Sequence, residues 1–252
     1  MDSESFCIIF LFVCGICFGS FLNCIALRIA REEDWIRERS YCLSCGHTLG
    51  FLDLIPILSW LFLKGRCRYC GSRISIRYPL SELFMGVIFV LTYLKTTPDL
   101  SLMISPLFLF SLFFCLSLID SDTYTIPDVF IVLGILNRIV LAVFQRDLQT
   151  DLNDLIGAFL IAFGIYATAY LTERISGREC MGGGDVKLIF MVCLYTGFYN
   201  GILVLFLSSF LGLLTVIVSG KRKIPFGPCI YLAAAAVILY GDQMIHLLNY
   251  PL

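Results

Sequence analysis

The segment 6–27 reads FCIIFLFVCGICFGSFLNCIAL, and this uncharged stretch decides the class of fold. A helix needs about 20 apolar residues to cross about 30 Å of hydrocarbon. Similar stretches recur along the chain, and the segments that we predict to span a membrane are 6–27, 80–95, 100–119, 128–144, 153–172, 186–199, 201–219 and 228–248. The sequence therefore predicts an all-α polytopic membrane protein with about eight transmembrane helices.

The composition agrees with this class of protein. Hydrophobic residues make up 59% of the 252 residues and charged residues only 15%, with a mean hydropathy of +0.89. Soluble domains contain about 45–50% apolar and about 25% charged residues, so a soluble globule and a disordered chain are both excluded. The net charge of −1 offers no broad positive field for nucleic acid, and the expected surrounding is a lipid bilayer.

Basic residues are distributed unequally between alternating loops. The segment 28–79 holds nine of the 18 Lys and Arg residues, whereas the loops on the opposite side hold only Lys95 and Arg146. Because basic loops are retained in the cytoplasm, we expect 28–79 to be cytoplasmic and both termini to lie outside. The expected organisation is a first transmembrane helix at 1–27, a cytoplasmic loop subdomain at 28–79, and a seven-helix transmembrane bundle at 80–252.

The cytoplasmic loop contains two CxxC pairs, Cys42 with Cys45 and Cys67 with Cys70, each followed by glycine. Four thiolates in this spacing suit tetrahedral zinc, and a closed set of four ligands indicates a structural site. A glycine after each pair permits a left-handed turn that directs backbone N–H groups at sulfur. Redox-active or structural disulfides are the alternative, although a reducing compartment disfavours them. His47 is an alternative ligand.

Two acidic residues at ends of predicted spans are candidates for catalysis. Asp120 ends an apolar helix, and Pro127 is expected to begin the next one. Asp185 follows three consecutive glycines at the start of the sixth span, where a helix N-terminus favours a negative charge. Ionisable residues at membrane depth indicate a functional site. Two neighbouring carboxylates share one proton, so that one can act as a general base and the other as a general acid. We predict that the two carboxylates meet and hydrolyse a peptide bond.

Other polar residues near this pair have simpler interpretations. Asp122 and Asp128 are expected to be loop or capping residues, and a capping role is the alternative for Asp120 and Asp185. Lys187 is expected to extend toward lipid headgroups, with substrate binding or tuning of Asp185 as the alternative. The chain contains only two histidines, His47 and His246, so no Ser/His/Asp set competes.

Several further motifs together resemble the bacterial type IV prepilin leader peptidase family of membrane aspartic proteases. The resemblance covers nearly the whole chain. Beside the CxxC pairs, the matching segments are Gly19-Ser-Phe-Leu-Asn23 with Arg28, Asp53-Leu-Ile-Pro56-Ile-Leu-Ser59-Trp60, Gly65-Arg-Cys67, Arg77-Tyr78-Pro79 with Glu82, the segment from Asp120 to Ile126-Pro-Asp128, and Gly182-Gly-Gly-Asp185. Ala30 and Cys24 depart from the family's usual residues.

This resemblance implies an activity and a location. It makes Asp120 and Asp185 the catalytic pair, with Asp122 as the fallback for the first. It implies a bacterial inner-membrane enzyme whose active site faces the cytoplasm, and whose substrate is a prepilin or pseudopilin with an apolar N-terminal helix behind a short basic leader. Many members also methylate the new N-terminal residue with S-adenosylmethionine, so the resemblance implies this second activity, and the residues that bind the methyl donor are not identified.

Two other functions fit parts of the sequence. A membrane thiol–disulfide oxidoreductase would use the CxxC pairs, and it requires these cysteines on the oxidising side. An ion or proton transporter would use Asp120 and Asp185 as a relay, but it gives no role to a metal-binding loop.

Overall fold

The computed structural model describes residues 2–34, 39–96, 103–145, 147–177, 181–221 and 223–249. Within these ranges the secondary structure is helical, with two isolated β-bridges and no longer strand. The chain divides into two compact units, 1–111 and 112–252, and the division falls within one helix. The expected organisation into 1–27, 28–79 and 80–252 has different boundaries. It was based on membrane topology and stays a prediction.

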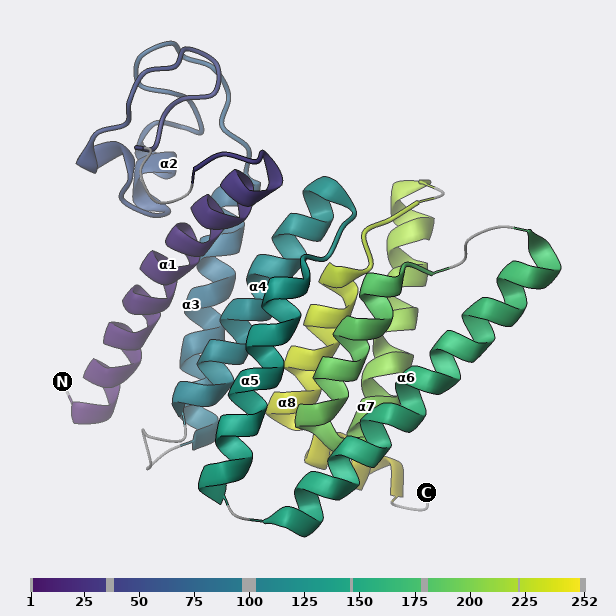
Figure 1. The fold of residues 1–252 in the computed structure, drawn as a ribbon. Coiled ribbons are helices and arrows are strands. Elements are labelled where there is room, and N and C mark those ends of the chain that lie inside the picture. The colour runs from purple at the N-terminus through teal and green to yellow at the C-terminus, as the bar shows by residue number, and fades with distance from the viewer. Residues whose placement is uncertain are drawn as a thin grey trace. The chain divides into compact units, whose positions relative to one another are not determined.

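The first unit contains two long helices that run side by side, α1 (Ser3–Ala30) and α3 (Arg77–Thr96), as Figure 1 shows. Small residues allow the close approach. A Cβ atom added to Gly15 would lie 2.8 Å from the Cα atom of Gly86, and one added to Gly19 would lie 2.8 Å from the Met85 side chain. Glycine is common where helix backbones approach closely in membranes, since packing drives their association there.

The loop between α1 and α3 contains little regular structure. It includes a short 3₁₀ helix, η1 (Phe51–Asp53), and one turn and a half of α-helix, α2 (Leu58–Phe62). Its two β-bridges join Tyr41 to Thr48 and Arg66 to Arg73, and each encloses one CxxC pair. The predicted loop subdomain is therefore organised around its cysteines.

The remaining helices follow the predicted order. They are α4 (Ile104–Thr123), α5 (Asp128–Gln145), α6 (Leu148–Ser176), α7 (Gly183–Ser219) and α8 (Gly227–Asn249). In the second unit α7 packs beside α5, α6 and α8 (Figure 1). The start of the predicted span 100–119 lies outside the described residues, and α5 begins at Asp128, one residue after the expected Pro127.

The helix α7 consists of two helical arms joined by a sharp reversal at Gly197. Gly197 has φ 71° and ψ −175°, which no helix contains. A Cβ atom added to Gly201 would lie 2.8 Å from the Cys193 sulfur, so the chain folds back onto itself within eight residues. The two arms, 183–196 and 198–219, correspond to the predicted spans 186–199 and 201–219. The prediction of about eight spanning helices in an all-α protein is confirmed in this way.

Length and composition alone identify five spanning helices among the described residues. These are Glu4–Ala30, Arg77–Thr96, Ile104–Thr123, Leu148–Ser176 and Gly183–Ser219. The last contains both arms of α7, and α8 contributes a shorter apolar stretch at Gly227–Gly241. The chain is therefore an integral membrane protein.

Candidate metal centre and active site

The four cysteines of the loop lie together. The sulfur atoms of Cys42, Cys45, Cys67 and Cys70 all lie within 4.8 Å of one another, and those of Cys42 and Cys70 are 3.9 Å apart. A Zn–S bond of about 2.3 Å separates two sulfurs of a tetrahedron by about 3.8 Å, so this cluster fits the ion. No disulfide joins any of the cysteines that the structure describes.

The two CxxC pairs form matching turns. The N–H of Cys42 donates to the His47 carbonyl (2.9 Å) and the N–H of Gly46 to the Cys42 carbonyl (2.8 Å). The second pair repeats this pattern, from Cys67 to Ser72 (2.8 Å) and from Gly71 to Cys67 (2.9 Å). The expected left-handed glycines are confirmed, with φ of 71° at Gly46 and 72° at Gly71.

Hydrogen-bond donors favour the thiolate forms of Cys42 and Cys70, whereas the pKa of Cys45 is raised to about 11. Backbone N–H groups of Cys45 and Ser44 hydrogen-bond to the Cys42 sulfur and lower its pKa to about 6. The Ser72 hydroxyl lies 3.1 Å from the Cys70 sulfur and lowers the pKa of that thiol. Metal ligands in proteins commonly have such second contacts, which orient them. The sequence pattern did not single out Ser72.

His47 and Asp53 support the cluster from outside. The His47 ring lies against the Tyr69 ring, with centroids 3.6 Å apart, and His47 is not among the clustered ligands. Burial raises the pKa of the Asp53 carboxyl, but Arg68 at 2.6 Å, the Gly50 N–H at 3.1 Å and the Tyr69 hydroxyl at 3.2 Å bring it below its ordinary value. Asp53 thus ties the segment between the two CxxC pairs to the second pair.

In the second unit Asp120 lies in the last turn of α4 and is only 4% exposed. Its Oδ2 accepts a hydrogen bond of 2.7 Å from the N–H of Gly227, at the start of α8. A Cβ atom added to Gly227 would lie 2.8 Å from the same oxygen. Gly227 therefore belongs to the site, although its sequence context, between two prolines, indicated only a turn.

Asp185 lies in the first turn of α7, as expected, and is half-buried. Its N–H donates to the Gly182 carbonyl at 3.1 Å. None of the three preceding glycines has a positive φ, and only Gly184 is in a place where an added Cβ atom would make a tight contact. A Cβ atom added to Gly184 would lie 3.1 Å from that of Ile126, in the segment that joins α4 to α5.

Since Gly184 contacts Ile126, the start of α7 that carries Asp185 lies against the segment that follows Asp120 and α4. Within the described residues neither carboxylate forms an ion pair. Two neighbouring carboxylates without a cation share a proton, and such a pair can act as acid and base. The side chain of His246 lies outside the described residues.

The other candidate residues lie nearby in exposed positions. Asp122 is exposed on the last turn of α4. Lys187 donates to Asp128 at 2.7 Å across the gap between α7 and α5, rather than contacting Asp185. The expectation that Lys187 extends toward lipid headgroups stays a prediction.

These features define a polytopic membrane protein with a cluster of four cysteines that could hold a metal ion, and with aspartates at the ends of two helices. Two family models match it: the bacterial peptidase A24 N-terminal domain over residues 13–96, and the type IV leader peptidase family over residues 107–217. The chain belongs to the type IV leader peptidase family. No solved structure matches it significantly.

Curated relatives carry consistent names. A prepilin leader peptidase/N-methyltransferase of Myxococcus xanthus is 38% identical over 73% of this chain and 54% of the relative. One of Dichelobacter nodosus is 33% identical over 84% of this chain and 74% of the relative. A type 4 prepilin-like proteins leader peptide-processing enzyme of Escherichia coli is 31% identical over 89% and 90%. The chain thus spans about half of the first relative and most of the last.

Proposed function

We propose that this protein is a membrane aspartic endopeptidase that removes the leader peptide from prepilin-like or pseudopilin-like substrates. The proposal is supported by the positions of Asp120, which is buried at the end of α4, and Asp185, which lies at the start of α7 beside the segment that follows α4, neither of them ion-paired within the described residues. The names of the relatives supply the substrate class.

The proposed chemistry is general acid–base hydrolysis. One carboxylate removes a proton from water while the protonated partner donates to the carbonyl oxygen of the scissile peptide bond. The Gly227 N–H holds one oxygen of Asp120 in place, and the first turn of α7 holds Asp185. Lys187 forms an ion pair with Asp128 and not with Asp120 or Asp185.

The proposed location is the cytoplasmic face of the bacterial inner membrane, with both termini outside. The distribution of Lys and Arg between the loops supports this orientation. A substrate whose basic leader lies in the cytoplasm and whose apolar helix lies in the bilayer would present its cleavage site at that depth. Asp120 and Asp185 lie at the ends of α4 and α7, which supports a site where these helices would meet the cytoplasm.

The test is cleavage of a pilin-like precursor by the purified full chain in lipid vesicles. We expect Asp120→Asn and Asp185→Asn each to reduce cleavage at least about 10²–10⁴-fold, because an amide cannot exchange the catalytic proton. Asp122→Asn is the matched control, since Asp122 is exposed two residues along the same helix. Normal cleavage by either of the first two variants, or loss in the control, would contradict the assignment.

We propose further that the cysteine cluster holds structural zinc. The spacing of the sulfurs supports four ligands and no open position, so zinc would order the loop rather than act on substrate. We expect a chelator or Cys67→Ser to remove about one equivalent of zinc and to make the loop sensitive to protease. Cys17→Ser is the control, because Cys17 is an exposed cysteine of α1 outside the cluster. A resistant loop without zinc would overturn the proposal.

The second proposed activity is methylation of the new N-terminus by S-adenosylmethionine. The names of the relatives, which include N-methyltransferase, support it. The donor supplies an electrophilic methyl group. Cleavage and methylation are tested separately by giving the enzyme a precursor or a peptide that is already cut, and by measuring the mass of each product.

The alternative thiol–disulfide activity has no support in the arrangement of the cysteines. The two CxxC pairs converge on one cluster, and no disulfide joins the cysteines in the described ranges. A carboxylate-relay transporter would still need a use for this cluster.

A further inference from the structure

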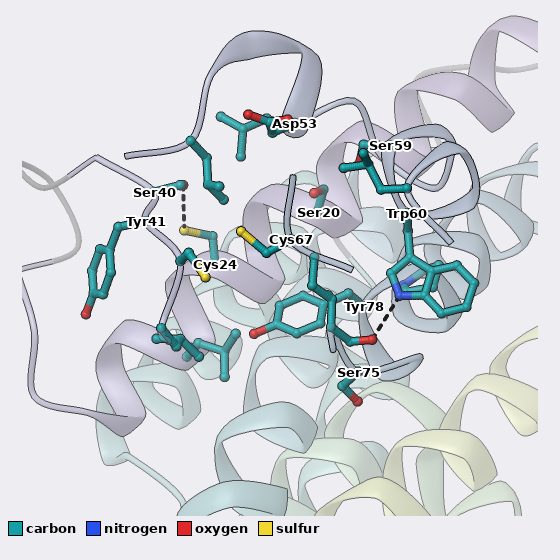
Figure 2. A pocket seen from close by; sticks show the side chains of 18 of the residues that line it. Ser20, Cys24, Ser40, Tyr41, Asp53, Ser59, Trp60, Cys67, Ser75 and Tyr78 are labelled. Atoms are coloured by element: carbon teal, nitrogen blue, oxygen red, sulfur yellow. Dashed lines mark hydrogen bonds between the residues drawn. The ribbon is translucent and has the colours of Figure 1, made fainter. Parts of the chain in front are cut away.

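The loop between α1 and α3 exposes large apolar side chains, although it lies outside the predicted spans. Figure 2 shows Ser59 and Trp60 of α2 among the side chains around a cavity of about 430 Å³ between the loop and the ends of α1 and α3. Other residues of α2 and its neighbour η1 do not line this cavity and are each more than half exposed. We call them the outer apolar face: Phe51, Leu52, Leu58, Leu61 and Phe62.

The position of α2 prevents these side chains from turning inward. Residues three and four apart share one side of a helix, so Leu58, Leu61 and Phe62 lie together. On the other side, the Trp60 indole N–H donates to the Ile74 carbonyl at 3.1 Å, as the dashed line in Figure 2 shows. The helices η1 and α2 contact each other, so their exposed residues form one surface. Exposed apolar patches of this kind mark interaction sites.

A hydrogen bond fixes α2 beside a membrane-spanning helix. The N–H of Ile57, just before α2, donates to a carboxylate oxygen of Glu82 at 2.7 Å. Glu82 lies in the second turn of α3, which is long and apolar enough to cross a membrane. Leu80 and Leu83, on either side of Glu82, are 55% and 42% exposed. The outer apolar face therefore lies at a level where α3 already presents leucines to its surroundings.

The same part of the loop is rich in positive charge. Its one acidic residue, Asp53, is already paired with Arg68 at 2.6 Å. Counting only Lys, Arg, Asp and Glu, segment 50–79 has a net charge of +4, with one acidic residue and five basic ones: Lys64, Arg66, Arg68, Arg73 and Arg77. An apolar surface bordered by basic residues is typical of segments that lie in the interface of an anionic membrane.

Two of these basic residues lie directly opposite each other. Arg66 and Arg73 form an antiparallel β-bridge, and both are exposed. Like charges at opposite positions of two strands destabilise the pairing. A phosphate group between them would remove the repulsion, since guanidinium groups bind phosphate through paired hydrogen bonds. Within the described residues neither arginine forms an ion pair with a carboxylate.

We propose that the outer apolar face lies in the interfacial layer of the bilayer, and that Arg66 and Arg73, with Lys64 beside them, bind the phosphate groups of anionic phospholipids. Segments of this kind insert their apolar side about 5–10 Å into the boundary between headgroups and acyl chains. The basic leader of a prepilin-like substrate would be repelled by these cations. A second copy of the loop would bring the same positive charge, so anionic lipid is the partner that fits both parts of the surface.

The first test measures the depth of position 62 by fluorescence quenching. The full chain with Phe62→Trp is placed in nanodiscs of phosphatidylglycerol that carries bromine near the carbonyl end of its acyl chains. We expect quenching of the additional indole, because bromine quenches tryptophan at short range. The wild-type chain, with Trp35 and Trp60, gives the baseline. Thr48→Trp, in the exposed polar segment 44–48, is the matched control and should add no quenching.

The second test measures the contribution of the arginines. Chymotrypsin cleavage after Phe62, followed by the mass of the fragment, should be slower in phosphatidylglycerol nanodiscs than in phosphatidylcholine ones. We expect Arg66→Gln with Arg73→Gln to weaken this protection by up to about 25-fold, since each basic residue near an anionic surface contributes about 1 kcal/mol, or about fivefold. Lys95→Gln, in the last turn of α3, is the control. The thermal unfolding midpoint verifies that each variant is folded.

The outcomes decide between lipid and other partners of this surface. Quenching of Phe62→Trp alone, with protection that depends on phosphatidylglycerol and on the two arginines, supports the proposal. It is overturned if Phe62→Trp is quenched no more than the wild-type chain, or if Thr48→Trp is quenched equally. Equal protection in both lipids, or in the arginine variant, would also overturn it. Protection in detergent that rises with protein concentration would assign the face to a second copy instead. None of these results depends on the proposed peptidase activity.

Discussion

The second unit contains two clusters of buried charge that differ in how the charge is balanced. In one, Arg138 of α5 lies between two aspartates of α6, 2.8 Å from Asp151 and 3.0 Å from Asp154. In the other, Asp120 lies at the end of α4 and Asp185 at the start of α7, and no cation pairs with them among the described residues. The two groups of charges therefore differ in pairing.

Arg138 of the first cluster also provides a hydrogen-bond donor to the end of the helical arm that carries Asp185. The Nε of Arg138 donates to the Leu194 carbonyl at 2.7 Å. This carbonyl lies in the last turn of the 183–196 arm, and the reversal at Gly197 removes its helical partner. Arg138 therefore satisfies an orphan acceptor while its own charge is balanced by Asp151 and Asp154. Removing one partner from a compensated cluster of this kind is costly, because it leaves an unpaired charge. The proposed catalytic pair instead requires carboxylates that no cation neutralises.

The largest effect on stability is expected when the balanced cluster is broken. Arg138→Met leaves two largely buried carboxylates without a cation and should lower the free energy of unfolding by about 3–5 kcal/mol. The measurement is thermal or denaturant unfolding in detergent. Asp120→Asn is the comparison, because it removes one of two like charges and should leave stability unchanged or higher. Equal losses in the two variants would remove the distinction between the clusters.

An intermediate effect is expected at the contact that positions Asp120. In Gly227→Ala the new Cβ atom must displace the Asp120 carboxylate, since it would lie 2.8 Å from Oδ2 and 3.1 Å from the Asp120 Cβ. We expect cleavage to fall about 10–100-fold, because a displacement of about 1 Å can have that effect. Gly183→Ala, where an added Cβ atom meets nothing within 4 Å, is the matched control. Similar rates in both variants would show that Gly227 does not position Asp120.

The smallest effect is expected at the exposed ion pair between Lys187 and Asp128. Their side chains are 54% and 67% exposed, and exposed pairs contribute about 0–1 kcal/mol. Lys187→Met should therefore change the unfolding midpoint only slightly, with the wild-type value as reference. A loss of stability as large as that of Arg138→Met would show that the Lys187 charge is needed to balance neighbouring carboxylates.

Local patterns were sufficient for the features that depend on neighbouring residues. The spacing of Cys42, Cys45, Cys67 and Cys70 predicted their convergence, because two short turns with left-handed glycines can form only a few geometries. The apolar runs predicted the spans, including the two arms of α7. Pairings over long distances in the sequence left no such pattern. Asp128 meets Lys187 across 59 residues, and Gly227 meets Asp120 across 107.

From the sequence alone, one can determine that the chain lies in a membrane, that its loop gathers four thiolates, and that Asp120 and Asp185 begin or end helices. These properties follow from runs and spacings of a few residues, within which the backbone has few choices. Only the tertiary structure decided which charges are neutralised, which glycine contacts Asp120, and which apolar side chains of the loop are exposed. Those properties depend on how whole helices pack, and packing distances are not encoded in any single segment.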